Sequence, residues 1–300
     1  MTRPRTVGAA VRETRRRLAA GGFDSAALEA RLLVASACGC DAANLIGHPE
    51  QALADDQFDR LRAALERRLM QEPLAYILRQ REFWSLPLTV TPDTLIPRPD
   101  SECLIEAART IAKDRSGLRV LDLGTGSGCL LLALLAEFPG AWGIGIDRSQ
   151  AALAVARGNA ERLGLAPRAN FVCSDWAAAL AGVFEIVVSN PPYISDQEWL
   201  SLDPGVRDFE PAAALRAGAR GTAAYEIILP QLERLLAPGG TALIEIGGES
   251  IARTIELVAA SQLQLVEIHM DLAGRARCLQ LSTPLSRGCK NSLGKELLHV

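Results

Sequence analysis

The stretch SNPPY, residues 189–193, combines residue types that can hold a planar amino group. Two prolines fix the backbone and remove two N–H donors, so the carbonyl of Pro191 is held in place and can face a ligand. Asn190 adds a side-chain oxygen acceptor, and the ring of Tyr193 can stack on a planar group. Two acceptors that bind both hydrogens of an –NH₂ group can tilt its nitrogen toward tetrahedral geometry. The stretch therefore indicates methyl transfer to an amide or aromatic amine, and the alternative is a rigid turn without a ligand.

A glycine-rich corner, VLDLGTGSG, precedes this stretch at residues 120–128. Its three glycines fall where a strand should turn into a helix, which lets the backbone approach a ligand and points helix N–H groups at it. The spacing differs from the Gly-x-Gly-x-x-Gly dinucleotide fingerprint, and no Gly-Lys-Ser/Thr sequence for a triphosphate is present. By itself the pattern also fits a tight turn without a ligand. The corner residues that we expect to contact a ligand are Gly124, Thr125, Gly126, Ser127 and Gly128.

Acidic and aromatic residues follow the neighbouring strands. Asp147 ends the next expected strand, 19 residues after Gly128, and a carboxylate there can accept hydrogen bonds from both ribose hydroxyls of a nucleoside. Asp122 adds negative charge, which favours a sulfonium or an amine over a pyrophosphate. S-adenosyl-L-methionine has a sulfonium, an amino group, a ribose and an adenine, so it fits better than a dinucleotide. Asp175 could meet the adenine amino group and Trp176 could lie against its ring, although Trp176 is equally compatible with a core position.

The order of the expected elements predicts how these residues are positioned. Residues 5–72 read as a small helical bundle, and five prolines between residues 73 and 99 exclude a long helix there. Within that stretch, EFWSLPLTVT predicts a hairpin. After residue 117, strands alternate with helices, which predicts a mostly parallel sheet with helices on both faces. Residues 223–240 read as a helix followed by a strand from Thr241, and we expect the last two strands to be antiparallel.

Composition narrows the class of protein. The chain of 300 residues is 49% hydrophobic and 22% charged, which is typical of a globular protein. Its net charge of −3 argues against a protein that lives on nucleic acid. Seven cysteines, an odd number mostly in apolar segments, suggest buried thiols in a reducing compartment. No ligand set at metal spacing, signal peptide or membrane-spanning stretch is present in the sequence, so we expect a cytoplasmic protein without a metal.

Longer motifs carry a family resemblance. DLGTGSG together with SNPPY resembles class I S-adenosylmethionine-dependent methyltransferases that modify planar amino groups, which include DNA adenine-N6 and protein glutamine-N5 enzymes. The stretches LEARLLVASACG, EPLAYILRQREFW, LIPRPDSE, FEPAAAL and LIEIG resemble the HemK/PrmC family. That family methylates the glutamine of the Gly-Gly-Gln motif in bacterial class I peptide chain release factors. The resemblance extends from about residue 6 to residue 283.

The resemblance implies an architecture and partners. The fold would be α/β: a seven-stranded, mostly parallel Rossmann-like sheet with an N-terminal helical bundle. The implied segments are a substrate-docking domain at residues 1–75, a hairpin linker at 76–99, the methyltransferase domain at 100–284 and a C-terminal tail at 285–300. The implied cofactor is S-adenosyl-L-methionine, which leaves as S-adenosyl-L-homocysteine, and the implied partner is the release factor. We expect a monomer that binds neither nucleic acid directly nor a membrane.

The resemblance also assigns roles to residues. By matching motif, the cofactor would be bound by residues 124–128, Asp147, Trp176 and Asn190. Catalysis would involve Asn190, Pro191 and Tyr193, and the substrate glutamine would be held by Asn190, Pro191, Pro192 and Tyr193, with Phe83 and Arg98 close by. The chain departs from the family pattern at Arg79, where glycine is usual, at Arg220, which replaces an acid, and at Ala276 and Ser101. None of these departures lies within the sequence of the corner or of SNPPY.

Other functions fit the sequence less well. A sister family with the same SNPPY-type stretch methylates a glutamine of a ribosomal protein, but its N-terminal domain looks different. An adenine-N6 nucleic-acid methyltransferase would need a basic target-recognition region, and this sequence has none. A nucleotide-binding module without catalysis predicts a damaged corner or a damaged SNPPY. An NAD-linked dehydrogenase would need the dinucleotide fingerprint.

Overall fold

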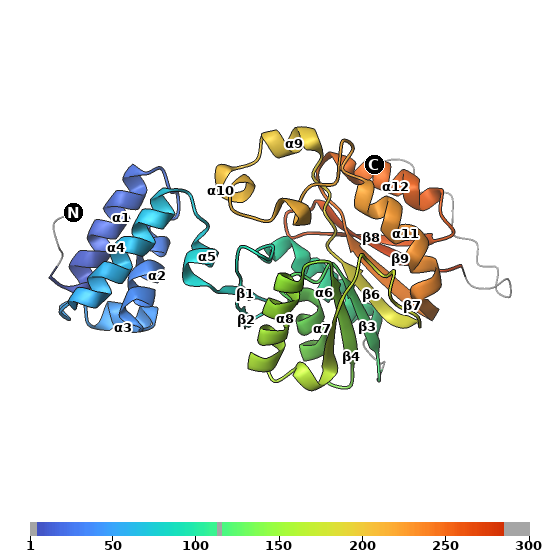
Figure 1. Cartoon of the computed structure of the whole chain (residues 1–300), viewed down its shortest axis with the longest axis horizontal. Coiled ribbons are helices and arrows are strands. Elements are labelled where there is room, and N and C mark those ends of the chain that lie inside the picture. The colour runs from blue at the N-terminus through green and yellow to red at the C-terminus, as the bar shows by residue number, and fades with distance from the viewer. Residues whose placement is uncertain (1–4, 113–115, 285–300) are drawn as a thin grey trace. The chain divides into compact units, whose positions relative to one another are not determined.

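A computed structural model describes residues 5–112 and 116–284 of the chain (Figure 1). Two compact units emerge, which we describe one at a time. The helical unit comprises residues 5–81, 90–92 and 202–210, and the sheet unit comprises residues 82–89, 93–112, 116–201 and 211–284. Among the described residues, no helix is both long and apolar enough to cross a membrane. The predicted tail at residues 285–300 lies outside the described residues, and the predicted domain boundaries remain predictions.

The helical unit folds around leucines that recur at helical spacing. Leu18, Leu33, Leu61 and Leu65 are fully buried in its core. Polar residues cap three of its helices: the side chain of Thr6 accepts a hydrogen bond from Ala9 N at 3.3 Å, and the side chains of Asp41 and Asp203 also accept from backbone N–H groups. The helices of this unit are α1 (Val7–Ala20), α2 (Ala26–Cys38), α3 (Ala42–Gly47), α4 (Asp55–Leu69), α5 (Leu74–Leu78) and the short α10 (Pro204–Arg207).

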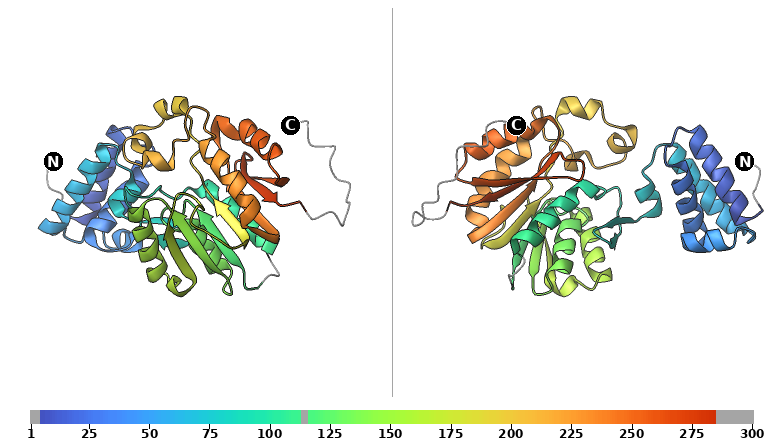
Figure 2. Two further views of the ribbon diagram at one scale, coloured as in Figure 1. Left: turned by 45° about the vertical axis from the view of Figure 1, so that its right-hand side comes forward. Right: turned by 180° about the vertical axis from the view of Figure 1, so that it is seen from behind.

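The sheet unit is built on a seven-stranded sheet. Its strands are β3 (Arg119–Leu123), β4 (Trp142–Asp147), β5 (Ala169–Cys173), β6 (Phe184–Ser189), β7 (Leu236–Glu245), β8 (Gln264–Met270) and β9 (Ala276–Ser282). They are ordered β5-β4-β3-β6-β7-β9-β8, and only β9 runs antiparallel to its neighbours (Figure 2). The mostly parallel sheet that the sequence predicts is confirmed, and so is the antiparallel pairing of the last two strands.

Helices cover both faces of this sheet, as Figures 1 and 2 show. On one face lie α6 (Glu102–Ala112), α7 (Cys129–Glu137) and α8 (Gln150–Arg162), and on the other lie α11 (Ala223–Leu235) and α12 (Ile251–Ala259). Successive residues of a strand point to opposite faces, so Val120 enters the first core and Leu121 enters the second. Burial on both faces explains why the strands read as apolar runs in the sequence.

The strand order reverses between β3 and β6, which creates the crevice where open α/β sheets bind ligands. The register aligns Leu123 of β3 with Ile146 of β4 and with Ser189 of β6. Because these strands are parallel, their carboxyl ends meet at one edge of the sheet. The residues brought to that edge are Gly124, Asp147 and Asn190.

The predicted hairpin is present as the paired strands β1 (Arg81–Phe83) and β2 (Leu86–Leu88). Trp84 and Ser85 connect them with φ of 51° and 59°, and positive φ at both central residues is the requirement of a type I′ turn. Glu102 stabilises this turn, because its Oε1 accepts a hydrogen bond from Trp84 N at 2.9 Å.

One local detail differs from the sequence-based expectations, and another explains a departure from the family pattern. The strand predicted from Thr241 begins earlier: α11 ends at Leu235 and β7 starts at Leu236. Pro238 and Gly239, which has a φ of 72°, prevent the helix from continuing to residue 240. The second detail is that Arg79 ends α5 in the left-handed conformation with φ of 57°, a position that glycine adopts more easily. This explains why glycine is the usual residue there in the family that the sequence resembles.

Candidate active site

The glycine corner is fixed to the end of β4 by backbone hydrogen bonds. Gly124 N and Thr125 N both donate to the carbonyl of Ile146, at 2.9 and 2.8 Å. The three corner glycines have φ of 76°, 53° and 83°, values that L-residues with side chains rarely adopt. No heavy atom would lie within 4 Å of a Cβ placed on Gly126, so its backbone borders open space. The strand-to-helix turn that the glycine spacing predicts is confirmed, and its backbone can approach a ligand closely.

Asp147 connects the corner to the next helix. Its Oδ2 accepts a hydrogen bond from Gly126 N at 2.9 Å, and its Oδ1 accepts one from Ser149 N at 2.9 Å. Each carboxylate oxygen can accept a second hydrogen bond. The half-buried carboxylate is therefore held rigidly and still has acceptor capacity for two ribose hydroxyls.

Asp122 lies beneath the corner and is 1% exposed. Thr125 Oγ1 donates to its Oδ2 at 2.6 Å, whereas its Oδ1 is buried with no hydrogen-bond partner among the described residues. Burial raises the pKa of Asp122 to about 7. An unpaired carboxylate oxygen in a low-dielectric position favours a nearby positive charge, so the residues present fit a cationic nucleoside such as S-adenosyl-L-methionine.

Trp176 borders the corner and also packs in the core. Its backbone has a φ of 48°, and its Cζ3 would lie 3.6 Å from a Cβ placed on Gly124. The side chain is half-buried and contacts the core between the sheet and α11. Trp176 therefore packs against the core and also lies next to the corner, and its contact with an adenine ring stays a prediction. Asp175, its neighbour, is exposed.

Four residues of SNPPY, Asn190 to Tyr193, line a pocket at the end of β6. We call residues 190–193 the clamp. They form the pocket wall together with Arg98, Leu95, Ile194, Ala214 and Leu215. The structure thus brings Arg98, more than 90 residues earlier in the chain, to the clamp as the resemblance implied. Phe83 does not line this pocket: it is 1% exposed and packs in the core beside Leu88, so we leave it out of the candidate site.

Two glycines that the sequence analysis did not assign hold the ring and backbone of Tyr193. A Cβ on Gly221, which has a φ of 72°, would lie 2.5 Å from the carbonyl oxygen of Tyr193. A Cβ on Gly247 would lie 2.9 Å from Cε2 of its ring. Burial raises the pKa of Tyr193 to about 12, so its phenol stays neutral at physiological pH. Gly247 is the last residue of LIEIG, a stretch that carries the family resemblance without revealing this role.

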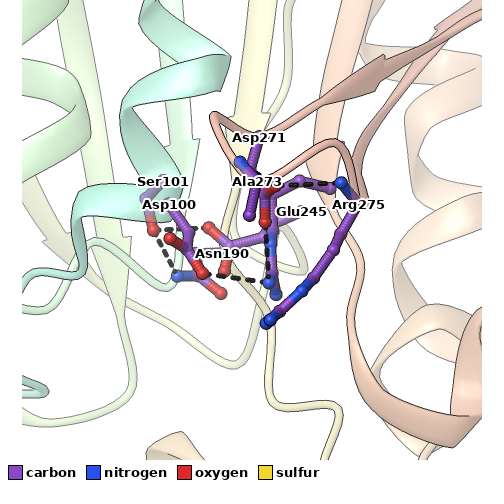
Figure 3. Close-up of polar contacts among 8 residues, drawn as sticks. Asp100, Ser101, Asn190, Glu245, Asp271, Ala273 and Arg275 are labelled. Atoms are coloured by element: carbon purple, nitrogen blue, oxygen red, sulfur yellow. Dashed lines mark hydrogen bonds and ion pairs between the residues drawn. The ribbon is translucent and has the colours of Figure 1, made fainter.

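The amide of Asn190 is anchored by two buried side chains. Its Nδ2 donates to Ser101 Oγ at 3.0 Å, and Ser101 Oγ donates to Glu245 Oε2 at 2.5 Å (Figure 3). Ser101 lies in a single 3₁₀ turn, Pro99–Ser101, and Glu245 ends β7. With Nδ2 turned to Ser101, the oxygen of Asn190 points the other way in Figure 3. The sequence contained these residues in LIPRPDSE and LIEIG, but gave no sign that they meet.

An ion-pair cluster holds the same turn in place. Arg277 of β9 contacts Asp100 Oδ2 at 2.9 Å and Asp271 Oδ2 at 3.2 Å. Its side chain is 11% exposed, so the pair with Asp100 is shielded from water on the arginine side. Asp271 also accepts hydrogen bonds from the backbone of Ala273 and Arg275, which orders the loop before β9 (Figure 3). Residues from the 3₁₀ turn, β7 and β9 therefore meet at the clamp, which follows β6.

Comparison with known proteins places the chain in a family. Residues 9–78 match the model of the PrmC N-terminal domain, and residues 114–274 match a methyltransferase domain. A release factor glutamine methyltransferase from Cereibacter sphaeroides is 44% identical over 268 residues, which cover 89% of this chain and 95% of that protein. One from Bradyrhizobium diazoefficiens is 41% identical over 281 residues, covering 91% and 94%. One from Rhodospirillum rubrum is 42% identical over 263 residues, covering 88% and 81%. With its corner and clamp in the geometry described above, the chain belongs to the release factor glutamine methyltransferase family.

Proposed function

We propose that this protein transfers a methyl group from S-adenosyl-L-methionine to the side-chain nitrogen, N5, of the glutamine in the Gly-Gly-Gln motif of class I peptide chain release factors. The observation that carries the proposal is the clamp with its anchored Asn190, which lies next to the glycine corner where the strand order reverses. The names of the relatives support the choice of release factor as the protein substrate.

The corner side of the crevice would hold the cofactor. Residues 124–128 would border its amino acid part, Asp147 would accept from the ribose, and Trp176 would lie near the base. The unpaired oxygen of Asp122 adds an electrostatic preference for a cation. When bound, S-adenosyl-L-methionine supplies an electrophilic methyl group, and S-adenosyl-L-homocysteine remains afterwards.

The clamp side would hold the substrate amide. The Pro191 carbonyl and Asn190 Oδ1 each accept one N–H of the glutamine side chain, while the neutral ring of Tyr193 packs on the amide plane. An amide nitrogen is a poor nucleophile because its lone pair is delocalised. Binding both hydrogens favours a tetrahedral nitrogen and directs its lone pair at the methyl. Positioning of this kind can supply about 7–11 kcal/mol, and the proton leaves from the methylated nitrogen.

We propose further roles for the remaining parts of the chain. The helical unit, whose core is independent of the sheet, would dock the release factor, and Arg98 would contact the substrate at the pocket wall. The protein would act as a monomer in the cytoplasm, where release factors meet the ribosome. It would contact neither nucleic acid nor a membrane directly.

Methyl transfer from labelled S-adenosyl-L-methionine to purified release factor tests the proposal. The control is a release factor in which the glutamine of the Gly-Gly-Gln motif is replaced. We expect label on the first protein and none on the control. Absence of label on both, with cofactor binding intact in calorimetry, would contradict the proposed substrate. In that case ribosomal proteins would be the next substrates to assay, and DNA would follow.

A further inference from the structure

The two ends of the Asn190 carboxamide have opposite hydrogen-bonding properties. Its oxygen accepts and its nitrogen donates, so a rotation of the amide group by about 180° turns an acceptor into a donor. A substrate amide nitrogen offers only hydrogens to the clamp. The clamp therefore works in one orientation of Asn190, and something in the structure must select that orientation.

The anchor described above makes this selection through two buried side chains. Ser101 is 2% exposed and Glu245 is 1% exposed, so the chain from Asn190 Nδ2 through Ser101 Oγ to Glu245 is shielded from solvent. A hydroxyl has one hydrogen, and here that hydrogen is directed to the carboxyl group of Glu245. The oxygen of Ser101 can then only accept from Asn190.

We propose that Ser101 and Glu245 are positioning residues for the methyl transfer: the carboxylate of Glu245 orients the Ser101 hydroxyl, which fixes Asn190 with its oxygen toward the substrate amide. The kinetic consequences of this proposal rest on the proposed function, whereas the hydrogen-bond chain itself does not. Neither residue needs to contact the substrate.

The charge of Glu245 decides whether the selection operates. An ionised carboxylate has no hydrogen to donate, so Ser101 must donate to it and accept from Asn190. A protonated Glu245 can donate to Ser101 Oγ, which releases the serine hydrogen. That hydrogen can bind the oxygen of a rotated Asn190, and both orientations of the amide then become available. We therefore expect the clamp to be ordered only when Glu245 is ionised.

The surroundings of Glu245 place this change near neutral pH. Burial raises the pKa of Glu245 to about 7, although the hydrogen bond from Ser101 and the charge of Arg277 lower it. The charged groups that act on it are Arg277, Asp100 and Arg98. The neutral groups that face it are the phenols of Tyr193 and Tyr225 and the thiols of Cys103, Cys129 and Cys278. Burial raises the pKa of each of these five groups, so they do not titrate near pH 7.

The kinetic test measures kcat, KM for release factor and cofactor affinity from about pH 5.5 to 9. In the unmodified enzyme we expect kcat to rise with pH around 7. Ser101→Ala should lower kcat roughly 5- to 10-fold, because the side-chain amide of Asn190 is no longer oriented. The affinity for the cofactor should not change. Ser101→Thr keeps the hydroxyl and should restore kcat. Glu245→Gln keeps the shape but can both donate and accept, so kcat should be low and the rise near pH 7 should disappear.

The matched control is Thr254→Val in α12. Thr254 is also fully buried, and its Oγ1 donates to the carbonyl of Ser250 at 2.9 Å, so this variant loses a buried hydroxyl hydrogen bond outside the site. It should lose stability but keep the kcat and the pH profile of the unmodified enzyme. If Ser101→Ala and Glu245→Gln also kept both, the positioning role would be refuted while the proposed function stood.

A spectroscopic test does not depend on the function. The chain has five asparagines, Asn44, Asn159, Asn170, Asn190 and Asn291, so selective ¹⁵N-asparagine labelling gives a simple amide spectrum. The side-chain signals of Asn190, assigned by their loss in Asn190→Ala, should shift with a midpoint near pH 7 and should not shift in Glu245→Gln. Signals of Asn190 that are unaffected by pH in the unmodified protein would overturn the inference. A shift in a protein that failed to methylate release factor would instead refute the proposed function alone.

Discussion

The corner and the clamp lie at the same edge of the sheet, but they are held in place by different means. The corner is fixed mainly by the backbone: positive-φ glycines and hydrogen bonds from Gly124, Thr125 and Gly126 to the end of β4. The clamp is fixed by side chains, because Asn190 depends on Ser101 and Glu245, which lie on other elements. Backbone positioning tolerates side-chain substitution at most positions other than the glycines and Asp147. Side-chain positioning can be removed by one substitution and can respond to pH.

We expect the largest loss of activity from a substitution in the clamp. Asn190→Ala removes one acceptor for a substrate N–H, and an unpaired buried donor costs roughly 1–3 kcal/mol. We expect kcat to fall about 5- to 150-fold while the cofactor dissociation constant, measured by calorimetry, stays nearly unchanged. Asn170→Ala, on the exposed start of β5, is the matched control and should be fully active. Full activity of Asn190→Ala would remove the clamp from the mechanism.

The corresponding change at the corner should affect binding instead of turnover. Asp147→Ala removes the proposed acceptor for the ribose hydroxyls and the partner of Gly126 N. Hydrogen bonds to charged groups contribute about 1.5–3 kcal/mol, so the cofactor dissociation constant should rise about 10-fold or more. At saturating cofactor, kcat should stay close to that of the unmodified enzyme. An unchanged dissociation constant would show that Asp147 does not contact the cofactor.

Alanine substitutions at two glycines of one loop distinguish the effect of backbone strain from the effect of contact with the clamp. Gly218 and Gly221 lie in one loop with φ of 74° and 72°, so alanine at either position adds strain of roughly 1–2 kcal/mol. Only the Cβ of Gly221→Ala would meet Tyr193, at 2.5 Å from its carbonyl oxygen, whereas that of Gly218→Ala would meet Ala223 at 3.8 Å.

We expect both variants to lower the melting temperature. Only Gly221→Ala should also lower kcat, because Tyr193 must shift to make room. Thermal unfolding and the methyl-transfer assay on the same preparations provide the measurement. Equal kcat in the two variants would mean that the position of the Tyr193 backbone does not matter for transfer.

The smallest effect concerns a property that both regions share: a buried carboxyl group. Burial raises the pKa of Asp122 at the corner and of Glu245 at the clamp to about 7 each. These values exceed those of unfolded chains, so the folded protein binds more protons between about pH 4 and 7. The free energy of unfolding contributed by these groups is therefore largest below about pH 4 and is lost as pH rises through about 7.

Asp122→Asn and Glu245→Gln should each remove part of this decline. The measurement is the melting temperature of the cofactor-free protein from about pH 5 to 8, where we expect differences of roughly a few degrees. If the decline in both variants matched that of the unmodified protein, the two carboxyl groups would not be the buried acids described here.

Local patterns made much of the fold and of the site predictable. The corner needs only nine consecutive residues and the clamp needs four, so their types and spacing indicate their chemistry directly. Strand–helix alternation likewise predicts the parallel sheet. The anchor was not predictable, because Ser101 lies 89 residues from Asn190 and 144 residues from Glu245 in the sequence. The same holds for Gly221 and Gly247, whose importance appears only once Tyr193 packs on them.

Two single residues show the limit of inference from resemblance. Arg98 lies at the clamp, as its motif implies, whereas Phe83 is buried in the core. An aromatic residue in a matching motif can serve packing as well as recognition, and only its solvent exposure distinguishes the two. The start of β7 was misplaced for a different reason: the apolar run that includes Leu235 and Leu236 suits a helix and a strand equally.

The position of β9 has a consequence for the synthesis of the protein. Strand β9, the last one among the described residues, lies between β7 and β8, so these two strands cannot reach their final places until residues 276–282 have been made. Arg277, which holds the turn that carries Ser101, arrives with the same strand. A nascent chain that stops before β9 therefore has its corner and its clamp sequence but not the support of the clamp. The site becomes complete only when residues 276–282 have left the ribosome.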